Sequence, residues 1–316
     1  MSNFAASYLR YTHHLEQIND GAIHCPERMI AEVEESYHDH LEGIARTVRR
    51  FHRKARLMMI SGPSSSGKTT TAHLLRDYLS RQGRKAQILS LDDFYKGADA
   101  APRLPDGSPD FERVEALEVD AIKACLRDLV ERGEARAPIY DFANSRPSGE
   151  CQEIRLEEDD MVVVEGIHAL NPIFTRELPE ESCVKLYVSV KQQIKDANGE
   201  VISPFDLRLV RRIVRDIQFR GTDAEETLSM WDSVVEGEDR YVRPYRHSAD
   251  FTVNSIHIYE PCVLRGIAIP LLRAIAEDSL QYRKARDLES RLMRFESVDP
   301  DLVPKDSMIR EFIGPK

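Results

Sequence analysis

The sequence has few features of secreted or membrane-spanning proteins. Its five cysteines, Cys25, Cys125, Cys151, Cys183 and Cys262, are far apart and form no Cys-x-x-Cys pair. A disulfide framework or a structural zinc site is therefore not expected, and a reducing compartment, the cytoplasm, is favoured. No apolar run approaches the roughly 20 residues needed to cross a bilayer. The start of the chain lacks the basic and then apolar layout of a signal peptide.

Basic residues are outnumbered by acidic ones. The chain has 44 Lys and Arg against 54 Asp and Glu, for a formal net charge of −10. Because nucleic-acid binders draw their affinity from clustered Lys and Arg, we expect neither a nucleic acid nor a membrane as partner. A hydrophobic content of 41% and a charged content of 31% are typical of a folded, soluble protein.

Short apolar runs alternate with longer segments of helical spacing. Such uniformly apolar strands predict an α/β fold, with a parallel sheet covered by helices on both faces. We place this core at residues 56–275. Residues 1–55 are predicted to form a helical N-terminal arm, and residues 276–316 a C-terminal helix and tail. The expected strands are 57–61, 86–90, 161–164, 184–190 and 251–254.

One motif carries clear chemistry. The segment from Gly62 to Thr69 reads GPSSSGKT, which fits the GxxxxGK[ST] pattern of a phosphate-binding loop (P-loop), and it lies between an apolar strand and a helix. Backbone amides and the helix N-terminus would bind nucleotide phosphates. Lys68 would neutralise their charge and Thr69 would ligate Mg²⁺. We therefore expect ATP and Mg²⁺ to bind at Gly62, Ser64, Ser65, Ser66, Gly67, Lys68, Thr69 and Thr70.

Carboxylates follow two further strands. Asp92 and Asp93 come after the strand at 86–90, and Glu165 ends the run at 161–164. Ligands of open α/β sheets bind beyond the carboxyl ends of the strands. A carboxylate there can accept the proton of an attacking hydroxyl, which is the role expected of Asp92. Glu165 is expected to hold the metal. A turn-capping role is an open alternative, above all for Asp93.

An arginine-rich segment suggests a lid at about 204–245. Arg208, Arg211, Arg212 and Arg215 would share one face of a helix, with Arg220 just beyond. Four cations on one face repel each other unless an anion offsets them, and a triphosphate would do so. A solvated basic face paired with nearby acidic side chains is the alternative.

Together these segments resemble the uridine kinase and phosphoribulokinase family of P-loop kinases. The chain is most similar to a bacterial uridine kinase-like subgroup that often carries an N-terminal TGS domain. No TGS-like segment precedes the helical arm in this sequence. The segments that carry the resemblance are 91–95 (LDDFY), 110–117 (DFERVEAL), 140–142 (YDF) with Arg146, 164–166 (VEG), 206–216, 220–250 and 307–314.

The resemblance implies ATP-dependent phosphorylation of a hydroxyl, with the 5′-hydroxyl of a uridine- or cytidine-like nucleoside as the first expectation. It implies Asp92 as the base, aided by Lys68, Arg212 and Arg215 at the phosphates. It also implies a substrate site formed by Glu112, Arg113, Tyr140, Arg146 and Arg220.

Three positions depart from ordinary uridine kinases. Arg113 stands where they have a histidine, Thr222 where they have an arginine, and Met230 where they have a glutamine. Because a site that hydrogen-bonds its substrate discriminates strongly, altered donors favour an altered substrate. A non-nucleoside or anionic acceptor is therefore one alternative. A nucleotide-regulated binding protein without turnover is another. The sequence also leaves open whether the chain forms a homo-oligomer.

Overall fold

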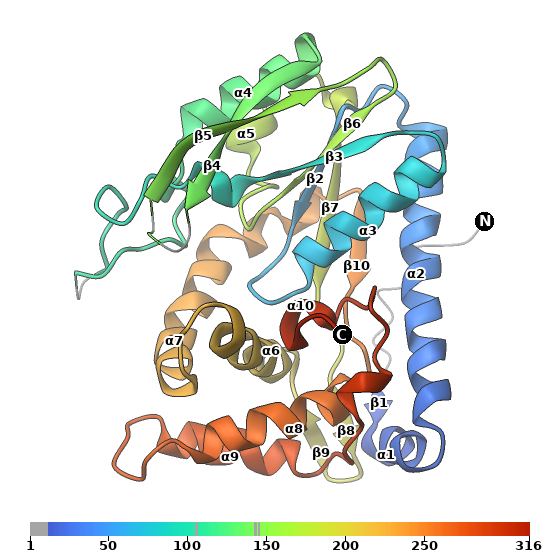
Figure 1. The fold of residues 1–316 in the computed structure, drawn as a ribbon, viewed down its shortest axis with the longest axis vertical. Helices are drawn as coiled ribbons and strands as arrows, with labels where there is room; N and C mark the ends of the chain where they lie inside the picture. Colours follow the sequence, from blue (N-terminus) through green and yellow to red (C-terminus); the bar gives the residue numbers. More distant parts are fainter. Residues whose placement is uncertain (1–11, 105–106, 142–143, 145) are drawn as a thin grey trace.

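A five-stranded parallel sheet forms the centre of the molecule (Figure 1). The computed structural model describes residues 12–104, 107–141, 144 and 146–316. The strand order is β10-β7-β2-β6-β3, and all four pairings are parallel. The strands are β2 (Leu57–Ser61), β3 (Ala86–Ser90), β6 (Met161–Glu165), β7 (Cys183–Ser189) and β10 (Phe251–Asn254).

Both faces of this sheet are covered, as predicted, because alternate side chains of a strand point to opposite sides. Met58 and Ile60 of β2 join one core with α2 (Pro26–Phe51), α3 (Lys68–Arg81) and α8 (Glu260–Arg273). Leu57 and Met59 join a second core with α4 (Val119–Glu131) and α5 (Pro172–Thr175). The carboxyl ends of all five strands are thereby left at one edge.

Two small sheets flank the central one. The hairpin of β4 (Glu134–Asp141) and β5 (Arg146–Arg155) lies over α4 in Figure 1 and was not predicted. The second strand, β5, is exposed along almost its whole length. Its sequence therefore lacks the alternation of apolar and polar residues that predicts a strand. The other small sheet joins β1 (His13–His14), β8 (Ile194–Asp196) and β9 (Gly199–Ile202).

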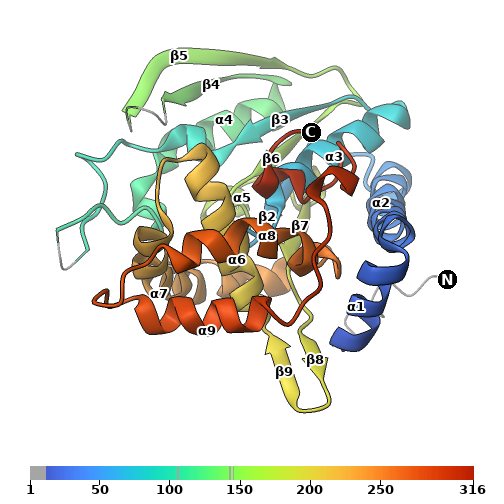
Figure 2. The same ribbon diagram turned by 60° about the horizontal axis from the view of Figure 1, so that its bottom comes forward.

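Helices from both ends of the described chain pack near the sheet (Figures 1 and 2). The segment predicted as a helical N-terminal arm contains α1 (Leu15–His24) and α2, and α2 packs on α3. Helices α6 (Pro204–Phe219) and α7 (Ala224–Tyr241) occupy the segment predicted as a lid. The C-terminal part contributes α9 (Tyr282–Leu292) and α10 (Arg310–Ile313), of which α10 packs on α6.

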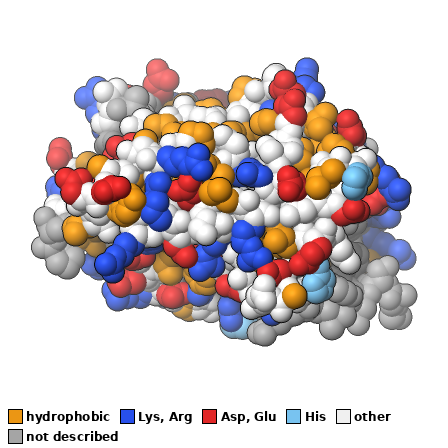
Figure 3. Space-filling model, turned by 90° about the horizontal axis from the view of Figure 1, so that it is seen from below, with side chains coloured by type: hydrophobic (Ala, Val, Ile, Leu, Met, Phe, Trp, Pro, Cys, Tyr) orange, Lys and Arg blue, Asp and Glu red, His pale blue; other side chains and the backbone are white. Residues whose placement is uncertain are grey.

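Among the described residues, short 3₁₀ segments link these elements. They are η2 (Leu91–Phe94), η3 (Val114–Ala116), η4 (Glu180–Ser182), η5 (Arg243–Ser248) and η6 (Pro300–Leu302). All five cysteines are free thiols. Within the described residues, every helix is too short or too polar to span a bilayer. Figure 3 shows cationic, anionic and apolar side chains interspersed over the face seen from below.

Candidate active site

The loop at 62–69 joins β2 to α3 and has glycine where no other residue fits. A Cβ atom on Gly62 would lie 2.0 Å from the carbonyl oxygen of Val188. Gly67 has a φ of +84°, and a Cβ there would lie 2.4 Å from the Sδ of Met308. Both positions therefore hold the backbone in the tight path that a phosphate-binding loop requires.

Two buried arginines of α6 hold this loop in place. Arg208 donates to the carbonyl oxygen of Ser64 (3.0 Å) and forms a two-pronged ion pair with Glu238 of α7 (2.6 and 2.8 Å). Arg211 donates to the carbonyl oxygen of Ser65 (3.2 Å) and pairs in the same way with Glu260. The anions that offset these two arginines are therefore carboxylates of the chain, not a nucleotide.

Arg212 and Arg215 differ from that pair. Arg212 donates to the Oγ of Ser64 (2.9 Å), so its guanidinium lies at the loop itself. Arg212, Arg215 and Arg220 all pair with Asp216, at 3.2, 2.7 and 3.6 Å. One carboxylate thus faces three guanidinium groups, so Asp216 alone offsets only part of their positive charge beside the loop. This is the environment that a polyphosphate requires.

Asp92 and Glu165 lie at the carboxyl ends of the neighbouring strands β3 and β6. Asp92 is in η2, directly after β3, and Glu165 is the last residue of β6. The Oε1 of Glu165 accepts a hydrogen bond from the Oγ of Ser90 (2.8 Å). Burial raises the pKa of both carboxyls, and the Lys68 ammonium opposes this rise in each. The charge of Asp92 adds to the rise in the pKa of Glu165, and the charge of Asp93 adds to that of Asp92. The structure therefore brings Lys68, Asp92 and Glu165 together.

Glu112 approaches the same place from the loop before η3. Burial raises its pKa to about 7, against the opposing effect of Arg212. Its Oε2 has no hydrogen-bond partner among the described residues. A Cβ atom on Gly237 would lie only 2.6 Å from the Cβ of Glu112, so α7 passes very close to this side chain. A buried carboxylate oxygen without a partner, next to Arg212, is suited to accept a hydrogen bond from a substrate hydroxyl.

The other predicted substrate residues are less closely grouped. The ring centre of Tyr140 lies 6.0 Å from that of Tyr95. The backbone N–H of Tyr140 donates a hydrogen bond to the Oδ1 of Asp93 (3.1 Å). Asp93 therefore attaches the β4–β5 hairpin to η2, which is a structural contact other than the turn cap considered for this residue. Arg113 is partly exposed and pairs with Glu115 (3.3 Å).

One predicted substrate residue, Arg146, lies on the exposed hairpin. Arg146 is exposed at the start of β5, opposite Asp141 across the hairpin. Phe142 lies outside the described residues.

Sequence reasoning missed four polar residues here. Glu238 and Glu260 pair with the α6 arginines, and Ser90 supports Glu165. His168, after β6, is only 1% exposed, and neither ring nitrogen has a partner among the described residues. Burial lowers its pKa to about 4, so it is neutral at pH 7. The sequence contains no spacing rule that could have identified these side chains.

The residues present fit a nucleotide and its metal. The Oγ atoms of Ser65 and Ser66 are buried without hydrogen-bond partners among the described residues, as expected where phosphate oxygens bind. The described part of the chain holds no cluster of three or more His, Cys, Asp or Glu side chains arranged for a metal. Magnesium is usually bound by one or two carboxylates together with substrate phosphates, so a magnesium site of this kind needs no such cluster.

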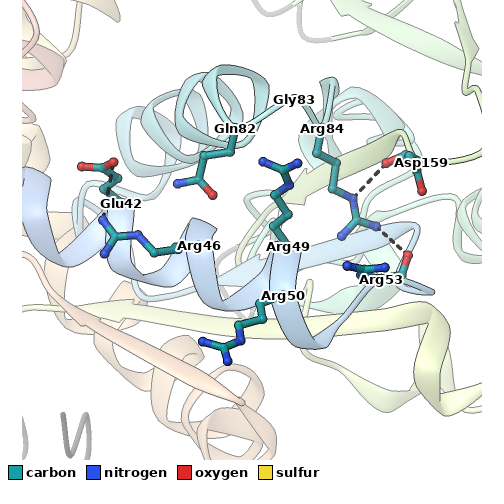
Figure 4. Close-up of a pocket in the computed structure, with 9 residues that line it drawn as sticks. All are labelled: Glu42, Arg46, Arg49, Arg50, Arg53, Gln82, Gly83, Arg84 and Asp159. Carbon is teal, nitrogen blue, oxygen red and sulfur yellow. Dashed lines mark hydrogen bonds and ion pairs between the residues drawn. The ribbon is translucent and has the colours of Figure 1, made fainter. Parts of the chain in front are cut away.

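A cavity of about 620 Å³ lies elsewhere (Figure 4). It is lined by Glu42, Arg46, Arg49, Arg50, Arg53, Gln82, Gly83, Arg84 and Asp159. These residues come from the ends of α2 and α3 and from the turn before β6, which are next to the amino ends of the strands. The cavity is therefore at the opposite edge of the sheet from the phosphate loop.

Comparison with known proteins gives a consistent result. Residues 57–260 match the model of the Phosphoribulokinase / Uridine kinase family. The chain is 30% identical over 182 residues to the uridine kinase of Mycoplasma genitalium, which covers 58% of this chain and 76% of that protein. It is 26% identical over 195 residues to the uridine kinase of Lactobacillus helveticus, and this match covers 61% of this chain and 83% of that protein.

Among solved structures, one similar chain is that of a possible uridine kinase from Bacillus stearothermophilus. The TM-score is 0.48 at 17% identity, and the match covers 68% of this chain and 97% of that one.

Proposed function

The chain belongs to the phosphoribulokinase and uridine kinase family, and on that basis we propose that it transfers the γ-phosphate of ATP to a hydroxyl group of a nucleoside. The observation that carries the proposal is the grouping of Asp92 and Glu165, at the carboxyl ends of β3 and β6, with Lys68 of the phosphate loop, whose ammonium opposes the rise in the pKa of both carboxyls. The names of the two uridine kinase relatives support a pyrimidine nucleoside as the first acceptor to test.

In this proposal the chain contributes mainly positioning and charge. Loop amides, Lys68, Arg212 and Arg215 bind the phosphates and offset the charge that develops during transfer. Glu165 and Thr69 would hold Mg²⁺, which neutralises phosphate charge when bound. Glu112 and Tyr140 hold the acceptor, while Arg113, Arg146 and Arg220 add positive charge around it.

Asp92 acts as the base. Its carboxylate accepts the proton of the acceptor hydroxyl as that oxygen bonds to the γ-phosphorus and the bond to ADP breaks. The raised pKa of Asp92 makes it a better proton acceptor than an ordinary aspartate. We further propose that the predicted lid does not swing as a whole, because Arg208 and Arg211 tie α6 to the loop and Arg208 also pairs with Glu238 of α7.

The test is ADP formation from MgATP with a panel of acceptors: uridine, cytidine, purine nucleosides, sugars, sugar phosphates and polyols. Asp92→Asn is expected to lose turnover by at least about a hundredfold while still binding ATP, since a positioned base contributes roughly 10²- to 10⁴-fold. Asp93→Asn is the matched control, because asparagine can still accept from the Tyr140 N–H and should retain most activity.

The panel also separates the alternatives. Asp92-dependent turnover with a nucleoside supports the proposal. Turnover only with an anionic or non-nucleoside acceptor would support kinase activity but contradict the proposal that the acceptor is a nucleoside. Tight ATP binding without turnover on any acceptor would favour a nucleotide-regulated binding protein.

A further inference from the structure

The C-terminal segment 307–313 lies directly against the phosphate loop. Figures 1 and 2 both show α10 next to the start of α3 and to α6. Met308 contacts the loop so closely that a Cβ on Gly67 would lie 2.4 Å from its Sδ. These contacts join residues that are about 240 positions apart in the sequence. The wall of the loop is therefore partly built from the far end of the chain.

Glu311 binds the N-terminus of α3 through its side chain. Its Oε2 accepts hydrogen bonds from the backbone N–H of Thr70 (3.1 Å) and from the Oγ1 of Thr70 (3.0 Å). Thr70 is the third residue of α3, and the first four N–H groups of a helix have no partner within the helix. Such groups attract anions. The carboxylate thus occupies donors that we expect to bind nucleotide phosphate.

The backbone of this segment is firmly anchored. Met308, Ile309 and Phe312 are fully buried. Ser307 donates to Glu34 of α2 (2.5 Å), which also accepts a hydrogen bond from Tyr259. Displacing the whole segment would expose three buried apolar side chains and break a buried hydrogen-bond network. The segment therefore stays in place when a ligand binds.

The Glu311 side chain is different, because it is only partly buried. It can leave Thr70 by rotation about its own bonds, at the cost of two hydrogen bonds to a carboxylate. A phosphate arriving at Thr70 would both replace this carboxylate and repel it.

We propose that Glu311 is an internal competitor for the nucleotide: it occupies the Thr70 donors in the nucleotide-free protein and must rotate away before a nucleotide phosphate binds there. This inference rests on the proposed function, because it requires a nucleotide at the loop. It makes nucleotide affinity a property of the C-terminal segment as well as of the loop.

A role of Glu311 in helix capping alone predicts a different effect on nucleotide affinity. If Glu311 only stabilised α3, its removal would lower stability and leave nucleotide affinity unchanged or weaker. If it competes, its removal lowers the stability of the free protein but raises affinity. The two readouts therefore move in opposite directions only under competition.

The experiment uses the full chain with Glu311→Gln, which removes the charge, and Glu311→Ala, which removes both hydrogen bonds. Asp301→Asn is the control, since this exposed carboxylate belongs to the same C-terminal region and bonds nothing in α3. Titration calorimetry with MgATP and with inorganic tripolyphosphate gives Kd, and thermal unfolding without ligand gives Tm. We expect both Glu311 variants to bind each probe about tenfold more tightly, with a lowered Tm, and the control to match the wild type.

Equal or weaker binding by the Glu311 variants, with wild-type protein that binds MgATP, would overturn the competition alone. A wild-type protein and variants that all fail to bind MgATP would overturn the proposed function and this inference with it.

Discussion

Arg211 and Glu260 form a two-pronged ion pair in which both side chains are completely buried. The Nε and Nη2 atoms of Arg211 lie 2.6 and 2.8 Å from the two carboxylate oxygens of Glu260. The third nitrogen of Arg211 donates to the carbonyl oxygen of Ser65 in the phosphate loop. The start of α8 is thereby coupled to the loop through one guanidinium group.

Breaking this pair should strongly destabilise the protein. Glu260→Ala leaves the Arg211 charge buried without a partner, which typically costs about 3–5 kcal/mol. The free energy of unfolding, measured by urea titration, should fall by that amount. Glu236→Ala, which removes an exposed carboxylate from α7, should change it by less than about 0.5 kcal/mol. A loss below about 1 kcal/mol for Glu260→Ala would show that water reaches this pair.

Glu112 should make stability depend on pH. Because burial raises its pKa from 4.5 to about 7, the folded protein binds this proton more tightly than the unfolded chain. Its stabilising contribution is therefore fully present below about pH 4.5 and is lost as the pH rises through about 7.

Glu112→Gln should consequently be more stable than the wild type at pH 8, by at most about 3 kcal/mol. The difference should shrink as the pH falls to 5. Urea titrations of both proteins at pH 5, 6, 7 and 8 measure it, and a difference that does not vary with pH would contradict the raised pKa.

Gly237→Ala tests the close approach of α7 to Glu112. The new methyl group would lie 2.6 Å from the Cβ of Glu112, so the carboxylate must move. If Glu112 holds the acceptor, kcat/KM for the acceptor should fall on the order of a hundredfold, while the KM for ATP changes little. Gly266→Ala in α8, where no atom lies within 4 Å of the new methyl group, should leave both values unchanged. An unaltered kcat/KM in Gly237→Ala would remove Glu112 from the acceptor site.

Arg84 ties down the end of α2 at the edge of the cavity in Figure 4. Its guanidinium donates to the carbonyl oxygens of Asp159 (2.9 Å), His52 (3.0 Å), Arg53 (3.3 Å) and Ala55. Lysine keeps the charge but cannot reach four carbonyls in a plane.

We therefore expect Arg84→Lys to lower the free energy of unfolding by about 3 kcal/mol, since the buried Arg84 side chain loses several of its hydrogen bonds to carbonyl oxygens. Arg49→Lys, which changes an exposed side chain of the same cavity, serves as the control in the same urea titration. Equal stability of the two variants would mean that charge, and not the planar shape of the arginine, matters at position 84.

The sequence predicted the central sheet because its inner strands are buried on both faces. The run at 161–164 (MVVV) is apolar throughout, and such a run can be recognised without knowing how the rest of the chain folds. The β4–β5 hairpin escaped prediction because β5 is largely polar and exposed. The β8–β9 hairpin did carry a usable signal, since Asn198-Gly199 is a typical turn between strands.

The residues of the candidate site also differ in whether the local sequence identifies them. Gly67, Lys68 and Asp92 could be predicted because a local motif or a strand end specifies them. Glu238 and Glu260 could not, because their pairing with α6 depends on how α6, α7 and α8 cross. Glu311 is the extreme case, since its partner Thr70 lies 241 residues earlier in the chain.

That separation has a consequence for synthesis on the ribosome. The chain emerges from its N-terminus, and its parts fold as they appear. The phosphate loop is complete in sequence long before Met308, Glu311 and Phe312 have been made. Until then Gly67 lacks the methionine that covers it and Thr70 lacks its carboxylate. A nascent chain therefore exposes an open phosphate loop, and the mature loop exists only once translation has passed residue 313.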